Sequence, residues 1–332
     1  MAKRLTAGLL VTAGALAAAP AAQAALVYVK RARTANPQVW VARDDGSHQR
    51  RVGRGTLPAI SPDGRWIAWQ DDRAGAVMLR KTAGRNTRRV ARSRVIGELK
   101  FSPDSTRLGI VLRRKLVVYD LASRDSATLA KGFVDGFSFA PDSKSLVYGT
   151  TGSSEAFDAG TDLYTVGLDS DAGKSRVTRD RKSLNPLWGP GGDIFFDRQT
   201  IRDGDAPTYN LYAIHPDGGA LRRVTALKIP PLLSGLVPLE LSADGTRLLA
   251  EFVGQDTSVG FAVNPVTGRT RALSKNMETG FVASNLTADG RTVLGMTGGA
   301  DPANDHDVVT LPYAGGKPTV LVRNAAYPDW SR

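Results

Sequence analysis

The stretch Ala59–Trp69 reads "AISPDGRWIAW". An apolar pair leads into Ser61-Pro62-Asp63-Gly64, and an aromatic-rich run leads out. Proline suits the second position of a type I turn, and glycine readily takes the left-handed geometry that follows. The stretch therefore predicts a strand, a tight turn and a second strand.

The same pattern recurs along the chain. The recurrences are "ELKFSPDSTRLGIVL" from Glu98, "GFSFAPDSKSLVYGT" from Gly136, "NPLWGPGGDIFFD" from Asn185, "LELSADGTRLLAEF" from Leu239 and "SNLTADGRTVLGMT" from Ser284. The residues that align with Ser61 lie 38 to 53 residues apart; they are Ser102, Ala140, Gly189, Ser242 and Thr287. A repeat of this length has room for four strands and indicates a repeat architecture.

A second hairpin pattern lies between these inner hairpins. It combines a β-rich run, a polar turn and a short second strand, and it occurs seven times against six complete inner hairpins. The chain ends explain the mismatch. "YPDWSR", Tyr327–Arg332, aligns Ser331 with Ser61 and supplies one inner strand, while "LVYVK", Leu26–Lys30, opens three strands that lack one. We therefore predict an all-β, seven-bladed β-propeller with four antiparallel strands per blade. The three N-terminal strands plus the C-terminal strand close the ring and remove its open edges.

The "SPDG" turns and the outer hairpins resemble TolB-type propeller repeats, which are relatives of the WD-repeat class. The resemblance covers nearly the whole chain after residue 24. The family includes periplasmic envelope proteins, propeller domains of peptidases and some sugar-acid lyases. Seven blades rather than six, with no α/β domain before them, depart from TolB proper and put a role in a Tol complex in doubt. Fold resemblance does not by itself imply function.

The N-terminus has the pattern of a secretory signal peptide. Lys3 and Arg4 precede the apolar run "LTAGLLVTAGALAAAP", and Ala22-Gln23-Ala24 has the form of a cleavage site. We expect cleavage after Ala24, and a monomeric propeller over residues 25–332 in the periplasm or outside the cell. An uncleaved membrane anchor is the alternative, but the apolar run is short and rich in alanine. No later segment is long and apolar enough to span a bilayer, and the chain has no cysteine for disulfides.

The loops point to one face as the place for binding. In a four-stranded blade, the "SPDG" turns and the outer-hairpin turns share one face, and the remaining loops share the other. The second face, called the loop face below, receives the long irregular loops, which are residues 151–161, 198–209, 226–237 and 298–306. Long loops on a rigid scaffold usually carry binding.

Polar residues two places before the Ser61-type position give a second candidate site. Lys100, Glu240, Asn285 and Asp329 stand there and are expected to lie near the axis, where they would line a small polar pocket. A solvated channel in which Lys100 and Glu240 cancel each other is the preferred interpretation, because charges rarely bury unpaired.

The positive charge is concentrated near the N-terminus. The whole chain carries a net charge of +12, and residues 30–115 hold 21 Lys and Arg against 7 Asp and Glu. Such a sector attracts anionic polymers or lipid headgroups. The candidate contacts are Arg88, Arg89, Arg92 and Arg94. Arginines that decorate exposed strands without any partner are an equally good interpretation, and export makes nucleic acid an incidental partner only.

Catalytic and metal-binding patterns are weak. The chain contains neither a G-x-S-x-G elbow nor cysteine, and His48, His215 and His306 are expected on different blades and faces. The repeated aspartates, such as Asp63 and Asp104, suit turns. Asp301, Asp305 and Asp307 are weak candidate calcium ligands, but a solvated loop is the better interpretation.

We therefore expect a non-enzymatic binding propeller without a cofactor or metal. It would dock a protein or an anionic envelope polymer through its loop face. The alternative is a lyase or hydrolase that acts on a sugar or small molecule in the axial pocket.

Overall fold

The structure is a computed structural model that describes residues 25–151, 160–169, 173–200, 207–230, 233–254, 258–275, 280–299, 301 and 304–331. The predicted signal peptide, residues 1–24, lies outside these ranges and stays a prediction. Every helix or strand element in the described part of the chain is a β-strand, as the sequence predicts. No described segment forms a helix that is long and apolar enough to cross a membrane.

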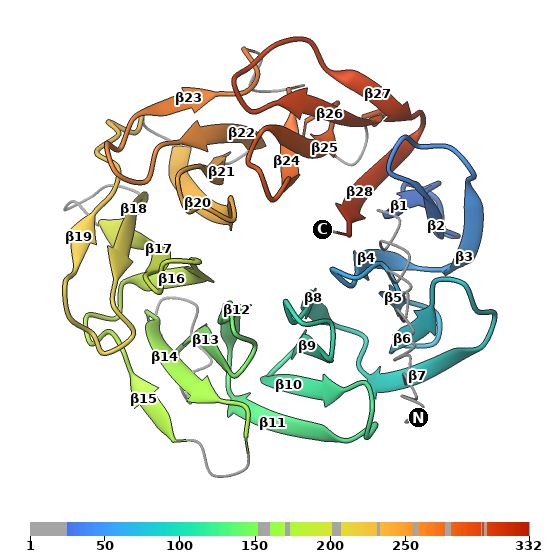
Figure 1. The fold of residues 1–332 in the computed structure, drawn as a ribbon, viewed down its shortest axis with the longest axis horizontal. Helices are drawn as coiled ribbons and strands as arrows, with labels where there is room; N and C mark the ends of the chain where they lie inside the picture. The colour runs from blue at the N-terminus through green and yellow to red at the C-terminus, as the bar shows by residue number, and fades with distance from the viewer. Residues whose placement is uncertain are drawn as a thin grey trace, which may run out of the picture.

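The strands pair in consecutive antiparallel units of four, numbered here along the chain (Figure 1). Unit 1 holds β28 (Ala325–Trp330), β1 (Ala25–Lys30), β2 (Gln38–Arg43) and β3 (Arg50–Arg54). Unit 2 holds β4 (Thr56–Ile60), β5 (Trp66–Asp71), β6 (Ala76–Lys81) and β7 (Thr87–Arg92). Unit 3 holds β8 (Ile96–Phe101), β9 (Arg107–Leu112), β10 (Lys115–Asp120) and β11 (Ser126–Lys131). Unit 4 holds β12 (Val134–Phe139), β13 (Ser145–Thr150), β14 (Asp162–Gly167) and β15 (Lys174–Arg176).

The remaining units follow the same order. Unit 5 holds β16 (Ser183–Trp188), β17 (Ile194–Thr200), β18 (Thr208–Ile214) and β19 (Arg222–Arg223). Unit 6 holds β20 (Leu233–Leu241), β21 (Leu248–Gly254), β22 (Ser258–Val263) and β23 (Thr270–Ala272). One parallel pair, Tyr209 with Gly235, joins units 5 and 6 into an eight-stranded sheet. Unit 7 holds β24 (Val282–Leu286), β25 (Thr292–Met296), β26 (Val308–Pro312) and β27 (Thr319–Val322).

The units stand side by side around a ring, with the first strand of each unit nearest the centre and the fourth at the rim (Figure 1). Unit 1 combines both ends of the chain. β28 pairs antiparallel with β1, and Leu26 stands opposite Trp330. Next to that pair, the backbone N–H of Ala25 at the start of β1 donates to Ser331 Oγ at 2.7 Å.

The "SPDG" segments are turns between the first and second strands, as predicted. In unit 2, β4 ends at Ile60, β5 begins at Trp66, and Gly64 has a φ of 68°. Units 3 and 4 place Ser105 and Ser143 at the same position, with φ values of 60° and 59°. A non-glycine residue is strained there. Each of these serine hydroxyls accepts a backbone hydrogen bond from the turn of the preceding unit, from Asp63 N and Asp104 N respectively. This contact explains why serine can stand there.

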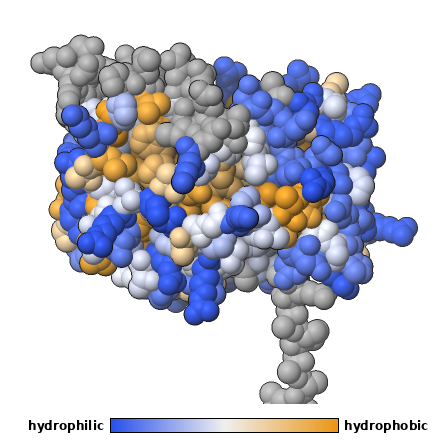
Figure 2. All heavy atoms as spheres, turned by 90° about the horizontal axis from the view of Figure 1, so that it is seen from above, coloured by the Kyte–Doolittle hydropathy of each residue, from blue (hydrophilic) through white to orange (hydrophobic). Residues whose placement is uncertain are grey.

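The hydrophobic core lies between neighbouring units rather than within one. One cluster joins Leu26 and Tyr28 of unit 1 with Leu294, Val308 and Val322 of unit 7. Seen edge-on, the face in view shows apolar residues gathered in patches among hydrophilic ones (Figure 2). The described part of the chain is therefore held together by packing from unit to unit around the ring.

Candidate functional site

The repeated aspartates belong to the turns. The hydroxyl of Ser242 donates to Asp244 Oδ1 at 2.6 Å, and the backbone N–H of Thr246 donates to the same oxygen at 2.9 Å. The hydrogen bond from Ser242, helped by those from Thr246, lowers the pKa of Asp244 to about 2. Ser61 with Asp63, Ser102 with Asp104 and Thr287 with Asp289 repeat the side-chain contact. The prediction that these aspartates serve turn geometry is thus confirmed by their hydrogen bonds.

Two of the predicted axial residues join neighbouring units. Asp329 Oδ2 accepts the backbone N–H of Ile60 at 2.8 Å, from unit 1 to unit 2. Glu240, whose exposed fraction is 4%, accepts the backbone N–H of Leu286 at 2.8 Å, from unit 6 to unit 7. Ser138 Oγ accepts the backbone N–H of Trp188 at 3.0 Å in the same way. In all three cases the side chain two places before the Ser61-type position bonds to the backbone one place before it in the next unit. We call these contacts inter-unit clips.

The other two axial residues have different surroundings. Lys100 forms an ion pair with Glu98 at 2.5 Å and donates to the carbonyl of Phe137 at 3.1 Å. Its partner is therefore Glu98 on its own strand, and the expected pairing with Glu240 across a channel is not among the described ion pairs. Asn285 is buried, and its Oδ1 has no hydrogen-bond partner among the described residues. Asp329, Glu240 and Lys100 thus make contacts at separate unit boundaries, and none of these contacts joins the four side chains in one pocket.

The four predicted basic contacts divide into two kinds. The guanidinium of Arg88 lies over the rings of Trp66 and Tyr119, 5.1 and 5.5 Å from their centroids. A cation over aromatic faces is held by the ring quadrupoles, so Arg88 joins units 2 and 3. Arg89, Arg92 and Arg94 are exposed, and the first two belong to the rim strand β7. These three remain candidates for an anionic partner.

The acidic loop residues are engaged individually. Asp305 forms an ion pair with Arg33, and Asp307 accepts the backbone N–H of Asn324 at 2.9 Å. Asp301 also has an interaction partner. The described residues include no group of three or more His, Asp or Glu that could hold a metal ion.

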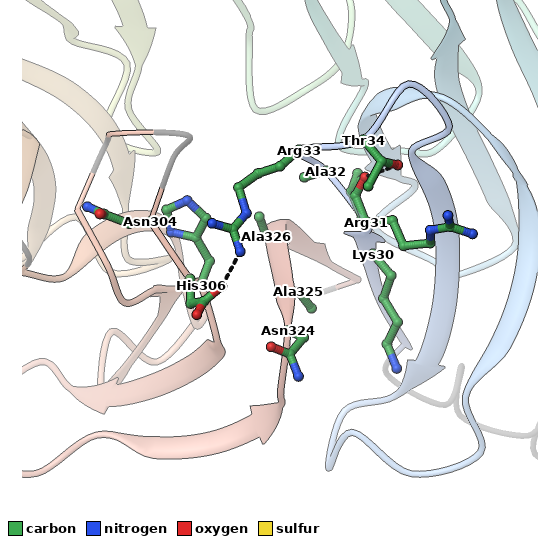
Figure 3. Close-up of a pocket in the computed structure, with 12 residues that line it drawn as sticks. Lys30, Arg31, Ala32, Arg33, Thr34, Asn304, His306, Asn324, Ala325 and Ala326 are labelled. Carbon is green, nitrogen blue, oxygen red and sulfur yellow. Dashed lines mark hydrogen bonds and ion pairs between the residues drawn. The ribbon is translucent and has the colours of Figure 1, made fainter.

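Much of the predicted long-loop region lies outside the described residues, namely 152–159, 201–206, 231–232, 300 and 302–303. The part that is described includes a cavity of about 270 Å³ between units 7 and 1 (Figure 3). The β1–β2 loop, the β25–β26 loop and the connection from β27 to β28 surround it. All three connections belong to the loop face, because each follows a second or a fourth strand.

Charged and polar side chains line the cavity together with apolar ones such as Val29, Ala325 and Ala326. Lys30, Arg31 and Arg33 stand against a single carboxylate, Asp305. Arg33 extends from the β1–β2 loop toward the β25–β26 loop, where it meets Asp305 (Figure 3). The side chains of Arg33 and Asp305 are 46% and 81% exposed. Lys30 Nζ is tied to Gln49 Oε1 at 2.7 Å, whereas Arg33 reaches across the cavity to Asp305.

His306 is the buried polar side chain of this cavity. Its Nδ1 lies 2.8 Å from the carbonyl oxygen of Thr297, and its exposed fraction is 6%. A carbonyl oxygen only accepts, so Nδ1 carries the hydrogen and donates. Nε2 is buried and has no partner among the described residues. Buried polar atoms normally have a partner, so Nε2 is an unsatisfied polar atom at the wall of the cavity. The sequence placed His306 on the loop face correctly but did not indicate this feature.

Most residues of the cavity were not predicted as a site; the sequence singled out only the loop 298–306, as a place for binding, and Asp305 within it, as a weak calcium candidate. Arg31 and Arg33 come from the β1–β2 loop of unit 1, and His306 comes from the β25–β26 loop of unit 7. Only the pairing of β28 with β1 brings them together. The predicted closure of the ring was the signal that could have found them, since it makes the first and last loops neighbours.

Sequence comparison leaves the family open, since no family model and no curated protein sequence matches the chain. Comparison with solved structures is informative. TolB from Acinetobacter baumannii superposes with a TM-score of 0.56 and 17% identity, over 93% of this chain and 83% of that one. Oligogalacturonate lyase from Vibrio parahaemolyticus gives a TM-score of 0.60 and 14% identity, over 90% and 84%.

The β-propeller domain of the Trilobed protease from Pyrococcus furiosus is also similar, with a TM-score of 0.62 and 13% identity, over 91% of this chain and 95% of that domain. These proteins differ in function, and at such identities the likeness is one of fold. The chain therefore has a TolB-like β-propeller fold.

Proposed function

We propose that the chain is an exported, non-enzymatic binding propeller that docks an anionic partner through its loop face. The observation that carries the proposal is the cavity between units 7 and 1. It combines excess positive charge with the buried His306 Nε2, which has no hydrogen-bond partner in the described part of the chain. The proposal counts each half of the eight-stranded sheet as one blade, which gives seven blades closed by β28 on β1.

The ion pair at the cavity favours exchange with a ligand. An exposed ion pair contributes roughly 0–1 kcal/mol, and the Arg33–Asp305 pair is exposed. A carboxylate or phosphate group can accept two parallel hydrogen bonds from a guanidinium, which makes a stronger contact. Such a group can replace Asp305 at Arg33. His306 Nε2 can then bond a neighbouring hydroxyl or acid group of the ligand.

The wider charge distribution supports an anionic partner. Arg50 and Arg51 on β3 and Arg89 and Arg92 on β7 are exposed on the rim of units 1 and 2. Unit 1 also provides Arg31 and Arg33 at the cavity. Cationic residues spread over one sector steer anionic polymers toward it. The partner proposed is an envelope polymer or protein surface rich in carboxylate or phosphate.

The proposal is tested with two defined probes, polygalacturonate for carboxylate and polyphosphate for phosphate. The immobilised chain 25–332 is titrated with each, and the combined variant Arg31→Gln/Arg33→Gln is compared with it. We expect that variant to bind about tenfold more weakly or worse, since hydrogen bonds to charged groups contribute about 1.5–3 kcal/mol. Binding should also weaken steeply with salt.

The matched control removes the same charge from the opposite face. Arg65 and Arg291 are exposed residues of the "SPDG" turns, with side chains 76% and 80% exposed. The variant Arg65→Gln/Arg291→Gln should bind like the parent. An equal loss in both variants would mean non-specific attraction, and no loss in either would remove the cavity from the proposal.

The enzymatic alternative would require the axial residues to converge on a substrate. Asp329 and Glu240 instead bond to the next unit, and Lys100 pairs with Glu98. These contacts favour the binding role. The discriminating measurement is turnover of saccharide, peptide and lactone panels by the parent and by Lys100→Met/Glu240→Gln. Activity that vanishes in the variant would support the enzyme.

A further inference from the structure

A separate feature lies at the boundary of units 4, 5 and 6. The second strands of units 5 and 6 carry acids at equivalent positions, Asp197 and Glu251. Asp197 lies three residues after Ile194, which pairs with Trp188. Glu251 lies three residues after Leu248, which pairs with Leu241. Both are buried, with exposed fractions of 2% and 6%. Glu251 Oε2 accepts the backbone N–H of Ala283 from the next unit at 3.1 Å.

Asp197 lacks the corresponding donor. The residue of unit 6 that is equivalent to Ala283 is Pro238, since each stands four places before its Ser61-type residue. Proline has no backbone N–H. Asp197 Oδ1 is accordingly buried with no hydrogen-bond partner among the described residues. The proline in the sequence therefore explains why the carboxylate of Asp197 lacks this backbone donor.

A second incomplete carboxylate lies at the preceding boundary. Asp135 stands where the register of β12 against β13 shifts between Val134 and Gly136. Its side chain lies over Gly149, whose added Cβ would fall 2.0 Å from Asp135 Oδ1. Gly149 is the unit 4 equivalent of Asp197, so Asp135 fills the space of the side chain that Gly149 lacks. Both oxygens of Asp135 are buried without a well-formed hydrogen bond in the described structure.

Asp135 is unusual for its place in the repeat. The residues equivalent to it are small or apolar or carry a hydroxyl; they are Thr56, Gly97, Leu184, Val237, Val282 and Ala326. An acid is therefore not needed for the fold at this position. The carboxylate points to a local function.

Asn185 places the two carboxylates at the same boundary, because its neighbour Leu184 pairs with Asp197 and Asn185 itself lies against Gly136, next to Asp135. Burial raises the pKa of Asp135 to about 8, and the charge of Asp197 adds to the rise. Burial also raises the pKa of Asp197 to about 7. Asn185, with a left-handed φ of 44°, lies beside both, because its side chain bonds to Asp197 and its Oδ1 faces Gly136. Thr161 contributes a hydroxyl next to Asp135.

We propose that Asp135 and Asp197 bind a hard divalent cation of the calcium class between units 4 and 5, with the side-chain oxygens of Asn185 and Thr161 nearby. Three buried carboxylate oxygens that have no hydrogen-bond partner among the described residues carry the proposal. Burying an ionised carboxylate alone is very costly, so it needs a counter-charge. Calcium takes six to eight oxygen ligands in flexible geometry and commonly combines carboxylates, carbonyls and water. Two carboxylates are the only acidic ligands here, which predicts modest affinity.

The cation would hold the first strand of unit 4 against the second strand of unit 5. Unlike the inter-unit clips, this join depends on the medium. Extracellular calcium modules bind with Kd values of about 10⁻⁴–10⁻³ M. A site of that strength would be filled outside a cell, in keeping with the proposed export.

The test uses the chain 25–332 after treatment with EDTA. Melting temperature and calorimetric titration are measured with calcium, magnesium and manganese chloride. We expect calcium to raise the melting temperature and to bind at one site per chain. Asp135→Asn and Asp197→Asn should each lose both effects. Glu251→Gln is the matched control, because Glu251 has its own partners, and it should keep the calcium response.

The isosteric variants also test the premise. Without cation and above about pH 8, where the carboxyl is ionised, Asp135→Asn should melt at or above the parent, because it removes a buried charge. A markedly lower melting temperature would mean that the carboxylate already has a structural partner, against the proposal. No calcium response in the parent, or an equal response in Asp135→Asn, would contradict the cation site. The two carboxyls would then share a proton instead.

Discussion

Aspartate has three different environments in this protein, and each environment determines whether the carboxylate is stabilised in its charged form. Asp244 is exposed and accepts hydrogen bonds from Ser242 and Thr246, which lower its pKa to about 2. Asp305 is exposed and pairs with Arg33. Asp197 is buried, and burial raises its pKa to about 7. Hydrogen bonds stabilise the charged form, and desolvation disfavours it. An acid therefore gains a proposed ligand role here only where burial is not matched by donors.

Glu251 makes this argument measurable through pH. Burial raises its pKa to about 8, although Ser258 and Ala283 donate to it. The unfolded carboxyl has a pKa of about 4.3, so the native state holds a proton more tightly. The stability that the protonated Glu251 contributes is therefore fully present below about pH 4.3 and is lost as the pH rises toward about 8. Glu251→Gln should reduce the fall in melting temperature between these limits, measured in EDTA. Identical pH profiles for parent and variant would contradict the raised pKa.

At the scale of the strand and turn, the repeat pattern predicted the elements well. The "SPDG" signature fixed the hairpin of β4 and β5, because proline, aspartate and glycine act within four residues. The same local reading placed Asp329 and Glu240 in a pocket. Their backbone partners, Ile60 and Leu286, are far away in sequence. Contacts between units depend on how neighbouring strands face each other, which no single repeat specifies.

Asp135 and the cavity were missed for related reasons. The carboxylate of Asp135 can be buried because Gly149, on the neighbouring strand, has no side chain and leaves space for it. The cavity joins Arg33 with His306 across the junction of the chain ends. A comparison of equivalent repeat positions would have singled out Asp135 as the lone acid. The sequence contained that signal, but the chemistry required knowledge of the neighbouring strand.

The inter-unit clip of Asp329 predicts a rescue pattern. Asp329→Ala should leave the backbone N–H of Ile60 without its acceptor, at a cost of about 1–3 kcal/mol in the free energy of unfolding. Asp329→Asn keeps an acceptor oxygen and should recover much of the loss. Chemical denaturation of the three proteins measures both effects. Equal destabilisation by alanine and asparagine would mean that charge, rather than the hydrogen bond to Ile60, matters.

For the whole molecule, the decisive feature is that unit 1 is built from both ends of the chain. β28 covers the inner edge of β1, and the two strands share the pairs Leu26 with Trp330 and Val27 with Asp329. Tyr28 and Leu26 also pack against Ala325 and residues of unit 7. If the seven units form a closed ring, no sheet edge between units 7 and 1 is left to a partner chain, and the loop-face cavity exists only in the closed form.

Deletion of residues 325–332 tests this closure. It would expose the backbone hydrogen-bonding groups of β1 and remove Asp329, which joins units 1 and 2. Unpaired strand edges promote aggregation, so we expect loss of a cooperative melt or gross aggregation, followed by calorimetry and light scattering. The control is Tyr327→Ser, which keeps the strand while changing an exposed side chain, 38% accessible. A truncated chain that melts like the parent would show that the other units hold together without closure, and the cavity between units 7 and 1 would lose its proposed role with it.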